Sequence, residues 1–170
     1  LRVSDTRGRS SRASAYVLVR EKSEMLVVTS TSDDLNADDG RTTLREAILR
    51  ANETPGPNTI TFISPLTITL LGGALPTITG NDTSIAGRPG VDVAGTPAAL
   101  NFCLGSDAAR TTIVWLRIHD CPEDGIELHG SAHWVAHVRS WNNNDDGVDL
   151  IGSDHHIGPN VEVWNNGSGF

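Results

Sequence analysis

The sequence predicts an all-β solenoid, a right-handed parallel β-helix with a capping α-helix near its N-terminal end. Three observations predict this fold class. The last third of the chain repeats with a period of 22 residues, short β-like segments are bounded by Gly, Pro or Asn, and one amphipathic segment precedes them. A fixed period of about 20 to 50 residues is typical of solenoids, in which each repeat stacks on the next.

The first 24 residues are mostly polar and show no hydrophobic period. We therefore expect a disordered or linker segment over 1–24 and the β-helix domain over 25–170. The one apolar run of this segment, 15–19, is too short for a complete signal-peptide core. Apolar and β-branched residues over 25–31 predict a strand, and the acidic stretch 33–40 predicts a loop after it.

One helix is predicted over about 44–51, or 43–52 with its caps. Its apolar residues recur at helical spacing and share one face: Leu44, Ala47, Ile48 and Ala51. Thr43 and Glu46 have the spacing of a capping box, which satisfies two free N–H groups of the first turn. We expect this helix to bury its apolar stripe over the open end of the coils.

After the helix the hydrophobic period changes to two. This change predicts short strands over 59–63, 66–71, 77–78 and 83–87. Clear coils of about 22 residues follow from residue 113. Ile113, Val135 and Ile157 are spaced 22 apart, and the segment DGIEL at 124–128 recurs as DGVDL at 146–150. We predict parallel pairing of the segments that start at 116, 138 and 161, with Val138 and Ile157 buried.

Residues 40–48, GRTTLREAI, resemble the Cys-Ser-Leu-Arg-Glu-Ala-Ile signature at the start of many bacterial parallel β-helix proteins. The resemblance covers about 25–87 and departs at Thr42 and Thr43, where the signature has Cys and Ser. It implies a secreted or surface-exposed bacterial protein. The wider pectin-lyase-like superfamily includes polysaccharide lyases, hydrolases, epimerases and adhesins, and fold alone does not choose among them.

The alternation of side chains along a strand separates inward from outward residues in the repeat. Asp120, Asn142 and Asn165 fall at the turn, where stacked Asn side chains can bond amide to amide between coils. The outward set predicts a ligand-binding face: Arg117, Arg139, His119, Trp141 and Trp164. Indole faces pack against sugar rings and arginines bind carboxylates, so the ligand would be an acidic or neutral glycan. The alternative is that both indoles pack under a loop or against another part of the protein.

Carboxylates form a second candidate site. Glu127 and Asp149 would face outward about 4.8 Å apart, a spacing at which they could bind calcium. As an enzyme the protein would use Asp145, Asp146, Asp149 and His155 for proton transfer. The chain lacks the Gly-His-Gly motif of the related polygalacturonases, and Asp before Gly is ordinary turn chemistry.

Composition restricts the partners. The net charge of −8 and the pI of about 5.1 argue against nucleic acid, and no apolar run is long enough for a membrane span. Apart from calcium, no cofactor is predicted. Cys103 and Cys121 permit one disulfide or two free thiols. Phe170 falls inside a third repeat, so we expect further coils or another chain to cover the core there.

Three functions fit these observations. The first is a secreted or cell-surface β-helix module that binds a polysaccharide or cell-surface glycan, as an adhesin does. The second is a polysaccharide-active enzyme, namely a lyase, a glycoside hydrolase or an epimerase. The third is a structural stalk. Exposed indoles on a flat face favour binding, whereas a cleft beside 145–156 favours catalysis.

Overall fold

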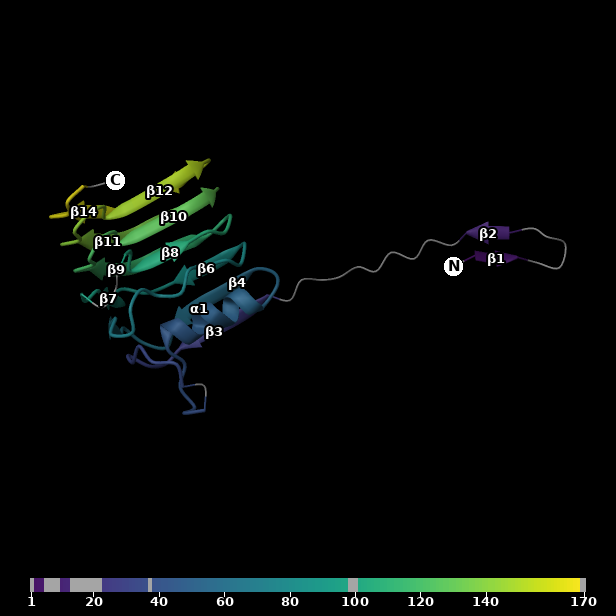
Figure 1. Ribbon diagram of the computed structural model, residues 1–170, viewed down its shortest axis with the longest axis horizontal. Helices are drawn as coiled ribbons and strands as arrows, with labels where there is room; N and C mark the ends of the chain where they lie inside the picture. The colour runs from purple at the N-terminus through teal and green to yellow at the C-terminus, as the bar shows by residue number, and fades with distance from the viewer. Residues whose placement is uncertain (1, 5–9, 13–22, 37, 98–100, 169–170) are drawn as a thin grey trace.

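The computed structural model describes residues 23–36, 38–97 and 101–168, together with the backbone of 2–4 and 10–12. The chain forms a parallel β-solenoid of about five turns with one short helix near its N-terminal end (Figure 1). This confirms the predicted fold class. The elements are β1 (Arg2–Ser4), β2 (Ser10–Arg12), β3 (Glu24–Val28), α1 (Leu44–Glu53), β4 (Asn58–Phe62), β5 (Thr67–Thr69), β6 (Thr83–Ala86), β7 (Asp92–Ala94), β8 (Leu104–Ser106), β9 (Thr112–His119), β10 (Ile126–Ser131), β11 (Trp134–Trp141), β12 (Val148–Ser153), β13 (His156–Ile157) and β14 (Glu162–Trp164).

Two parallel sheets form the sides of the solenoid. The larger has nine strands along the path β13-β11-β9-β6-β4-β3, with β14, β5 and β7 attached, and the smaller has the order β12-β10-β8. Val135 pairs with Ile113 on one side and Ile157 on the other, as the 22-residue period predicts. The predicted parallel pairing of β9, β11 and β14 is confirmed. β1 and β2 pair antiparallel, and the other residues of the predicted N-terminal segment up to 22 lie outside the described part.

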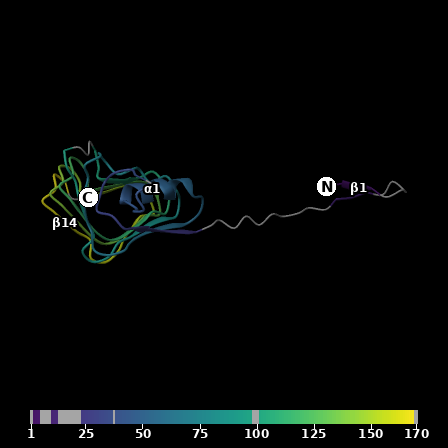
Figure 2. The same ribbon diagram turned by 90° about the horizontal axis from the view of Figure 1, so that it is seen from below.

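Helix α1 lies across the interior of the coils near their N-terminal end, as Figure 2 shows. The capping box is present: the N–H of Glu46 donates to the Thr43 hydroxyl, and a Glu46 carboxylate oxygen accepts the Thr43 N–H. Leu44 and Ile48 are completely buried, which confirms the apolar stripe. Arg45 is also buried and forms a bidentate pair with Asp33 at 3.0 Å, which ties the helix to the loop that precedes it.

Left-handed backbone conformations recur at three positions of the coil. Each position is a column of non-glycine residues with positive φ: Arg110, Ala132 and Asp154; Trp115, His137 and Asn160; Asp120, Asn142 and Asn165. A left-handed residue redirects the strand, so these columns divide the coil into short straight segments. Asn and Asp adopt this conformation at low cost, whereas Trp seldom does.

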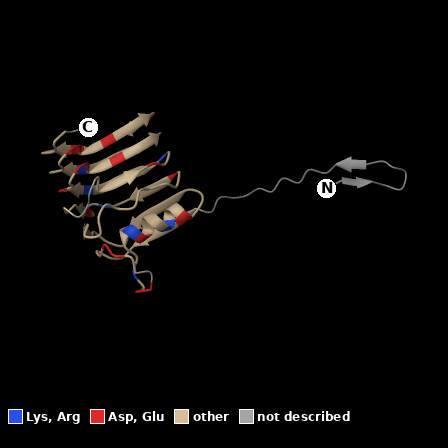
Figure 3. Ribbon diagram, in the orientation of Figure 1, with Lys and Arg blue, Asp and Glu red and all other residues tan. Residues whose placement is uncertain are grey.

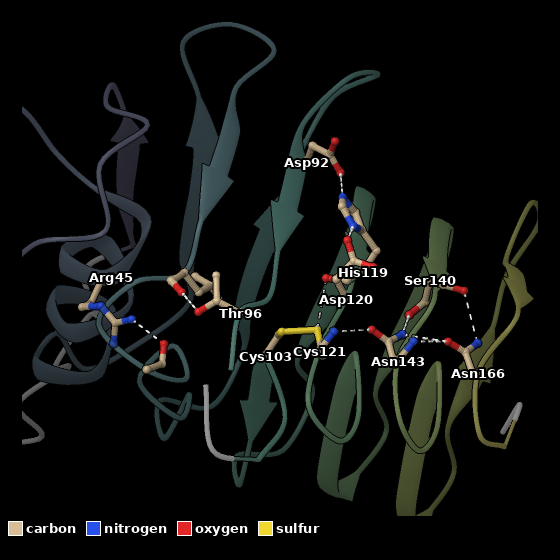
Figure 4. Close-up of a disulfide and its surroundings, with 12 residues drawn as sticks. Arg45, Asp92, Thr96, Cys103, His119, Asp120, Cys121, Ser140, Asn143 and Asn166 are labelled. Carbon is tan, nitrogen blue, oxygen red and sulfur yellow. Dashed lines mark hydrogen bonds and ion pairs between the residues drawn. A yellow bond between two sulfur atoms is a disulfide. The ribbon is translucent and has the colours of Figure 1, made fainter. Parts of the chain in front are cut away.

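The prediction that Asn142 and Asn165 stack between coils is wrong. Asn142 and Asn165 are exposed and adopt the left-handed conformation, with φ of 57° and 52°. The stacked amides belong instead to the residues that follow them, Asn143 and Asn166 (Figure 4). Asn143 Nδ2 donates to Asn166 Oδ1 at 2.9 Å, and Asn143 Oδ1 accepts the N–H of Cys121 at 3.1 Å. The left-handed residue turns the chain, which places its successor inside the coil.

Burial and cross-linking settle two further predictions. Val138 is buried as expected, but Ile157 is 44% exposed because it lies in the last described coil, where no described strand covers it. Cys103 and Cys121 form a disulfide between neighbouring coils, so the alternative of two free thiols is wrong (Figure 4). Within the described ranges, no helix has the length and apolar character needed to cross a membrane.

Candidate functional site

The outer face of β9, β11 and β14 carries the residues that the sequence singles out for ligand binding. Strand register aligns Arg117 with Arg139, and His119 with Trp141 and then Trp164. Figure 3 shows basic residues on β9 and β11, and acidic residues on β10 and β12 of the other sheet. The structure therefore brings the five predicted ligand-binding residues onto one face.

The rings on this face stack on one another, which changes how a sugar could use them. The Trp141 ring lies between those of His119, with a centroid distance of 4.3 Å, and Trp164, with a distance of 5.0 Å, and the planes are within 15° of parallel. Both faces of the Trp141 indole are therefore occupied. A sugar could reach the edge of the Trp141 indole but could not stack on its faces, and ligand binding by Trp141 and Trp164 stays a prediction.

A groove of about 350 Å³ lies beside the arginine column. Its walls come from the 88–91 loop, from Trp115 and His137, and from Arg117 and Arg139. The Trp115 and His137 rings stack with a centroid distance of 4.0 Å, and Trp115 is 43% exposed. This volume falls within the range of small-ligand sites.

Sequence analysis missed Trp115 and His137, although both recur at the 22-residue period. Both residues adopt the left-handed conformation. A strict two-residue alternation therefore cannot assign their direction. The sequence shows only that two residues with aromatic rings are 22 positions apart. That spacing does not by itself indicate a groove.

Opposite charges flank the arginine pair. Arg117 Nη2 lies 3.5 Å from Asp92 Oδ2, and Arg139 Nε lies 2.9 Å from Glu162 Oε2. Asp92 also approaches His119 Nε2 at 3.3 Å, while Nδ1 of the same ring lies 2.7 Å from Asp120 (Figure 4). Two carboxylates thus orient the histidine at the start of the ring ladder.

The acidic residues group differently from the prediction. Glu127 and Asp149 are aligned, but Glu127 Oε1 contacts His129 Nε2 at 2.6 Å. Among the described residues, Asp124, Asp145 and Asp146 each place one carboxylate oxygen within 4.8 Å of the other two. Carboxylate oxygens of this kind could hold a calcium ion.

Burial and neighbouring negative charges act on this carboxylate group. Burial is the main cause that raises the pKa of Asp124 to about 6, and the charge of Asp145 adds to the effect. Burial also raises the pKa of Asp146. The backbone N–H of Asp146 donates to Asp124 Oδ1 at 2.8 Å, which partly offsets the shift.

The histidine of the predicted catalytic set lies elsewhere. Asp146 precedes β12 and His155 follows it, and six residues of strand separate them by roughly 15–20 Å. His155 stacks on His133, and His155 Nδ1 accepts the N–H of His133 at 3.5 Å. His155 therefore connects coils, and the structure does not bring Asp145, Asp146, Asp149 and His155 together at one reacting atom.

Replacing Asp124 with Asn should raise the melting temperature at pH 7 by about 2–4 °C, which corresponds to about 1 kcal/mol after allowing for partial solvent exposure. The raised pKa means that the folded state binds the proton more tightly than the unfolded state. Stability therefore falls as the pH rises from about 4 to about 6, and the full penalty applies above pH 6. At pH 4 the two proteins should melt together, as measured by circular dichroism. Asp38→Asn, the same change at an exposed site, is the control, and an equal gain at both pH values would contradict the mechanism.

Comparison with known proteins identifies no ligand for this face, so its ligand must be inferred from the chemistry of its residues. The groove, the arginine pair and the stacked rings are the features that a ligand would meet. Asp124 lies at the turn before β10, and Asp145 and Asp146 lie at the turn before β12; none of the three lines the groove. No family model, no curated protein and no solved structure gives a significant match to the chain.

Proposed function

We propose that the protein is a glycan-binding β-helix module whose ligand lies along the outer face of β9, β11 and β14. The observation that carries this proposal is the groove of about 350 Å³, in which aromatic rings and arginines line the same space. Sugars present both C–H faces and hydroxyl groups, so their sites combine rings with hydrogen-bond donors. The groove offers both kinds of group.

The regular stacking of the coils supports a polymeric ligand. Neighbouring strands lie about 4.8 Å apart, so each side chain of a column is repeated at this interval along the solenoid axis. The exposed edges of Trp141 and Trp164 continue the face beyond the groove. A chain of sugars along the axis would meet similar groups on successive coils, which favours a polysaccharide over a small molecule.

We further propose that the protein works outside the cytoplasm, at the cell surface or after secretion. The disulfide between Cys103 and Cys121 supports this location, because disulfides persist mainly in oxidising compartments. A location at the surface would also give the module access to polysaccharides of its own or another cell.

Binding to a panel of neutral and acidic glycans tests the proposal. With the best ligand of the panel, Trp115→Ala should weaken binding fivefold or more by calorimetry, because it removes a partly exposed ring from the groove. Trp134→Ala removes an equally exposed Trp that stacks on His156 outside the groove, and it should leave the affinity unchanged. A panel without a ligand, or equal affinities for both variants, would refute glycan binding at this groove.

A further inference from the structure

The charges along the outer face follow an unusual order. Strand register places Asp92, Arg117, Arg139 and Glu162 in one column, so that the order of charges is negative, positive, positive, negative. Each arginine has its acid on the side away from the other arginine. Like charges in directly opposed positions destabilise a sheet. The centre of the column is therefore a position where an anion would be favoured.

Arg117 is held only loosely by its acid. Its Nη2 lies 3.5 Å from Asp92 Oδ2, and its buried Nε has no hydrogen-bond partner among the described residues. The Arg117 side chain is 39% exposed and that of Arg139 is 55% exposed, so a ligand can reach both. A guanidinium binds a carboxylate through two parallel hydrogen bonds when the site is preorganised.

His137 supplies a further donor at the same groove. Asn160 Nδ2 lies 3.0 Å from His137 Nδ1, and an amide nitrogen can only donate, so Nδ1 accepts. The proton of the neutral ring is therefore on Nε2, for which the described residues provide no acceptor. The Trp115 ring, parallel to it within 3°, fixes the plane of the imidazole.

We propose that this groove contains a carboxylate subsite, in which Arg117 and Arg139 clasp the carboxylate of a uronic acid residue and His137 donates to the same sugar. The subsite rests on the proposed glycan-binding function and specifies its ligand as an acidic polysaccharide. A single carboxylate between the two guanidinium groups would restore the alternation of charge along the column. The outer acids, Asp92 and Glu162, hold the arginines in place and also compete with the ligand for them.

The test compares uronate hexamers with the same hexamers after their carboxyl groups have been reduced to alcohols. Hexamers of galacturonate, mannuronate and glucuronate are titrated into the intact chain and the affinities measured by calorimetry. For the best acidic hexamer, Arg139→Gln should weaken binding about tenfold, because a charge-assisted contact is lost. The affinity for the reduced hexamer should stay the same in this variant.

For a second variant, we expect uronate affinity to change in the opposite direction. Glu162→Gln removes the acid that competes for Arg139, so it should strengthen uronate binding about two- to fivefold. Glu162 is half exposed, and its removal should leave the fold intact. Arg50→Gln, which removes a positive charge from helix α1, is the control for general electrostatic attraction and should leave the affinity unchanged.

The outcomes separate this subsite from the broader function. Equal affinity for acidic and reduced hexamers, with both weakened by Trp115→Ala, would overturn the carboxylate subsite and leave glycan binding intact. Weaker uronate binding in Glu162→Gln would also overturn the subsite. No binding of any hexamer would overturn the subsite, whereas the proposed function is overturned by failure of the whole glycan panel or by equal affinities of Trp115→Ala and Trp134→Ala.

Discussion

Replacing Leu44 with Asp should lower the melting temperature by about 10 °C or more. Leu44 has no exposed surface and lies on the face of α1 that covers the interior of the coils. The change removes a buried leucine and places a carboxylate among apolar side chains, which together cost about 4 kcal/mol or more. For a protein of this length, each kcal/mol corresponds to about 2–4 °C. Thermal melts followed by circular dichroism measure the effect.

Leu49→Asp is the matched control, since it makes the same chemical change on the same helix. Leu49 is 37% exposed, so its carboxylate could reach water and the melting temperature should change by no more than about 2 °C. Equal losses for the two variants would contradict the capping role, because they would show that the loss comes from the helix itself. An unchanged melt in Leu44→Asp would contradict it directly.

The cap could be predicted because its determinants are local in sequence. Thr43 and Glu46 lie three residues apart, and the apolar stripe repeats at helical spacing. The ion pair of Arg45 with Asp33 escaped prediction, although it is buried in the same place. A buried arginine depends on acceptors that the fold brings in from a distance, in this case the carbonyl oxygens of Gly73 and Ala74. Helical spacing does not reveal such distant partners, so it does not predict that this arginine is buried.

Strand register could also be predicted, because a 22-residue repeat fixes which residues are neighbours. It placed Arg117 beside Arg139 and Trp141 beside Trp164. It did not predict that the His119 ring would stack on Trp141, since ring orientation depends on side-chain torsions that the period does not determine. A left-handed residue caused the error at the turn, because one such residue shifts the inward and outward pattern by one position. Asn143 was missed in favour of Asn142 for this reason.

Replacing Asn143 with Ala should also cause a large loss of stability. Its Oδ1 accepts the N–H of Cys121, and its Nδ2 donates to Ser140 Oγ and to Asn166 Oδ1. Asn143→Ala would leave the buried Cys121 N–H without an acceptor and remove the link to the next coil. We expect a loss of about 2–4 kcal/mol, or about 5–10 °C in melting temperature.

Asn144→Ala is the control that distinguishes the hydrogen bonds of the Asn143 amide from a general preference for Asn at this turn. Asn144 is exposed and its side chain bonds to no other described residue, so its replacement should change the melting temperature by less than about 2 °C. Asn143→Asp keeps the oxygen that accepts from Cys121 but presents a second oxygen to Asn166 Oδ1. It should therefore lose stability at pH 7 and recover part of it at pH 4, where a protonated carboxyl can donate. Melting temperatures that do not differ between Asn143→Ala and Asn144→Ala would show that the coils are held by backbone pairing and apolar packing alone.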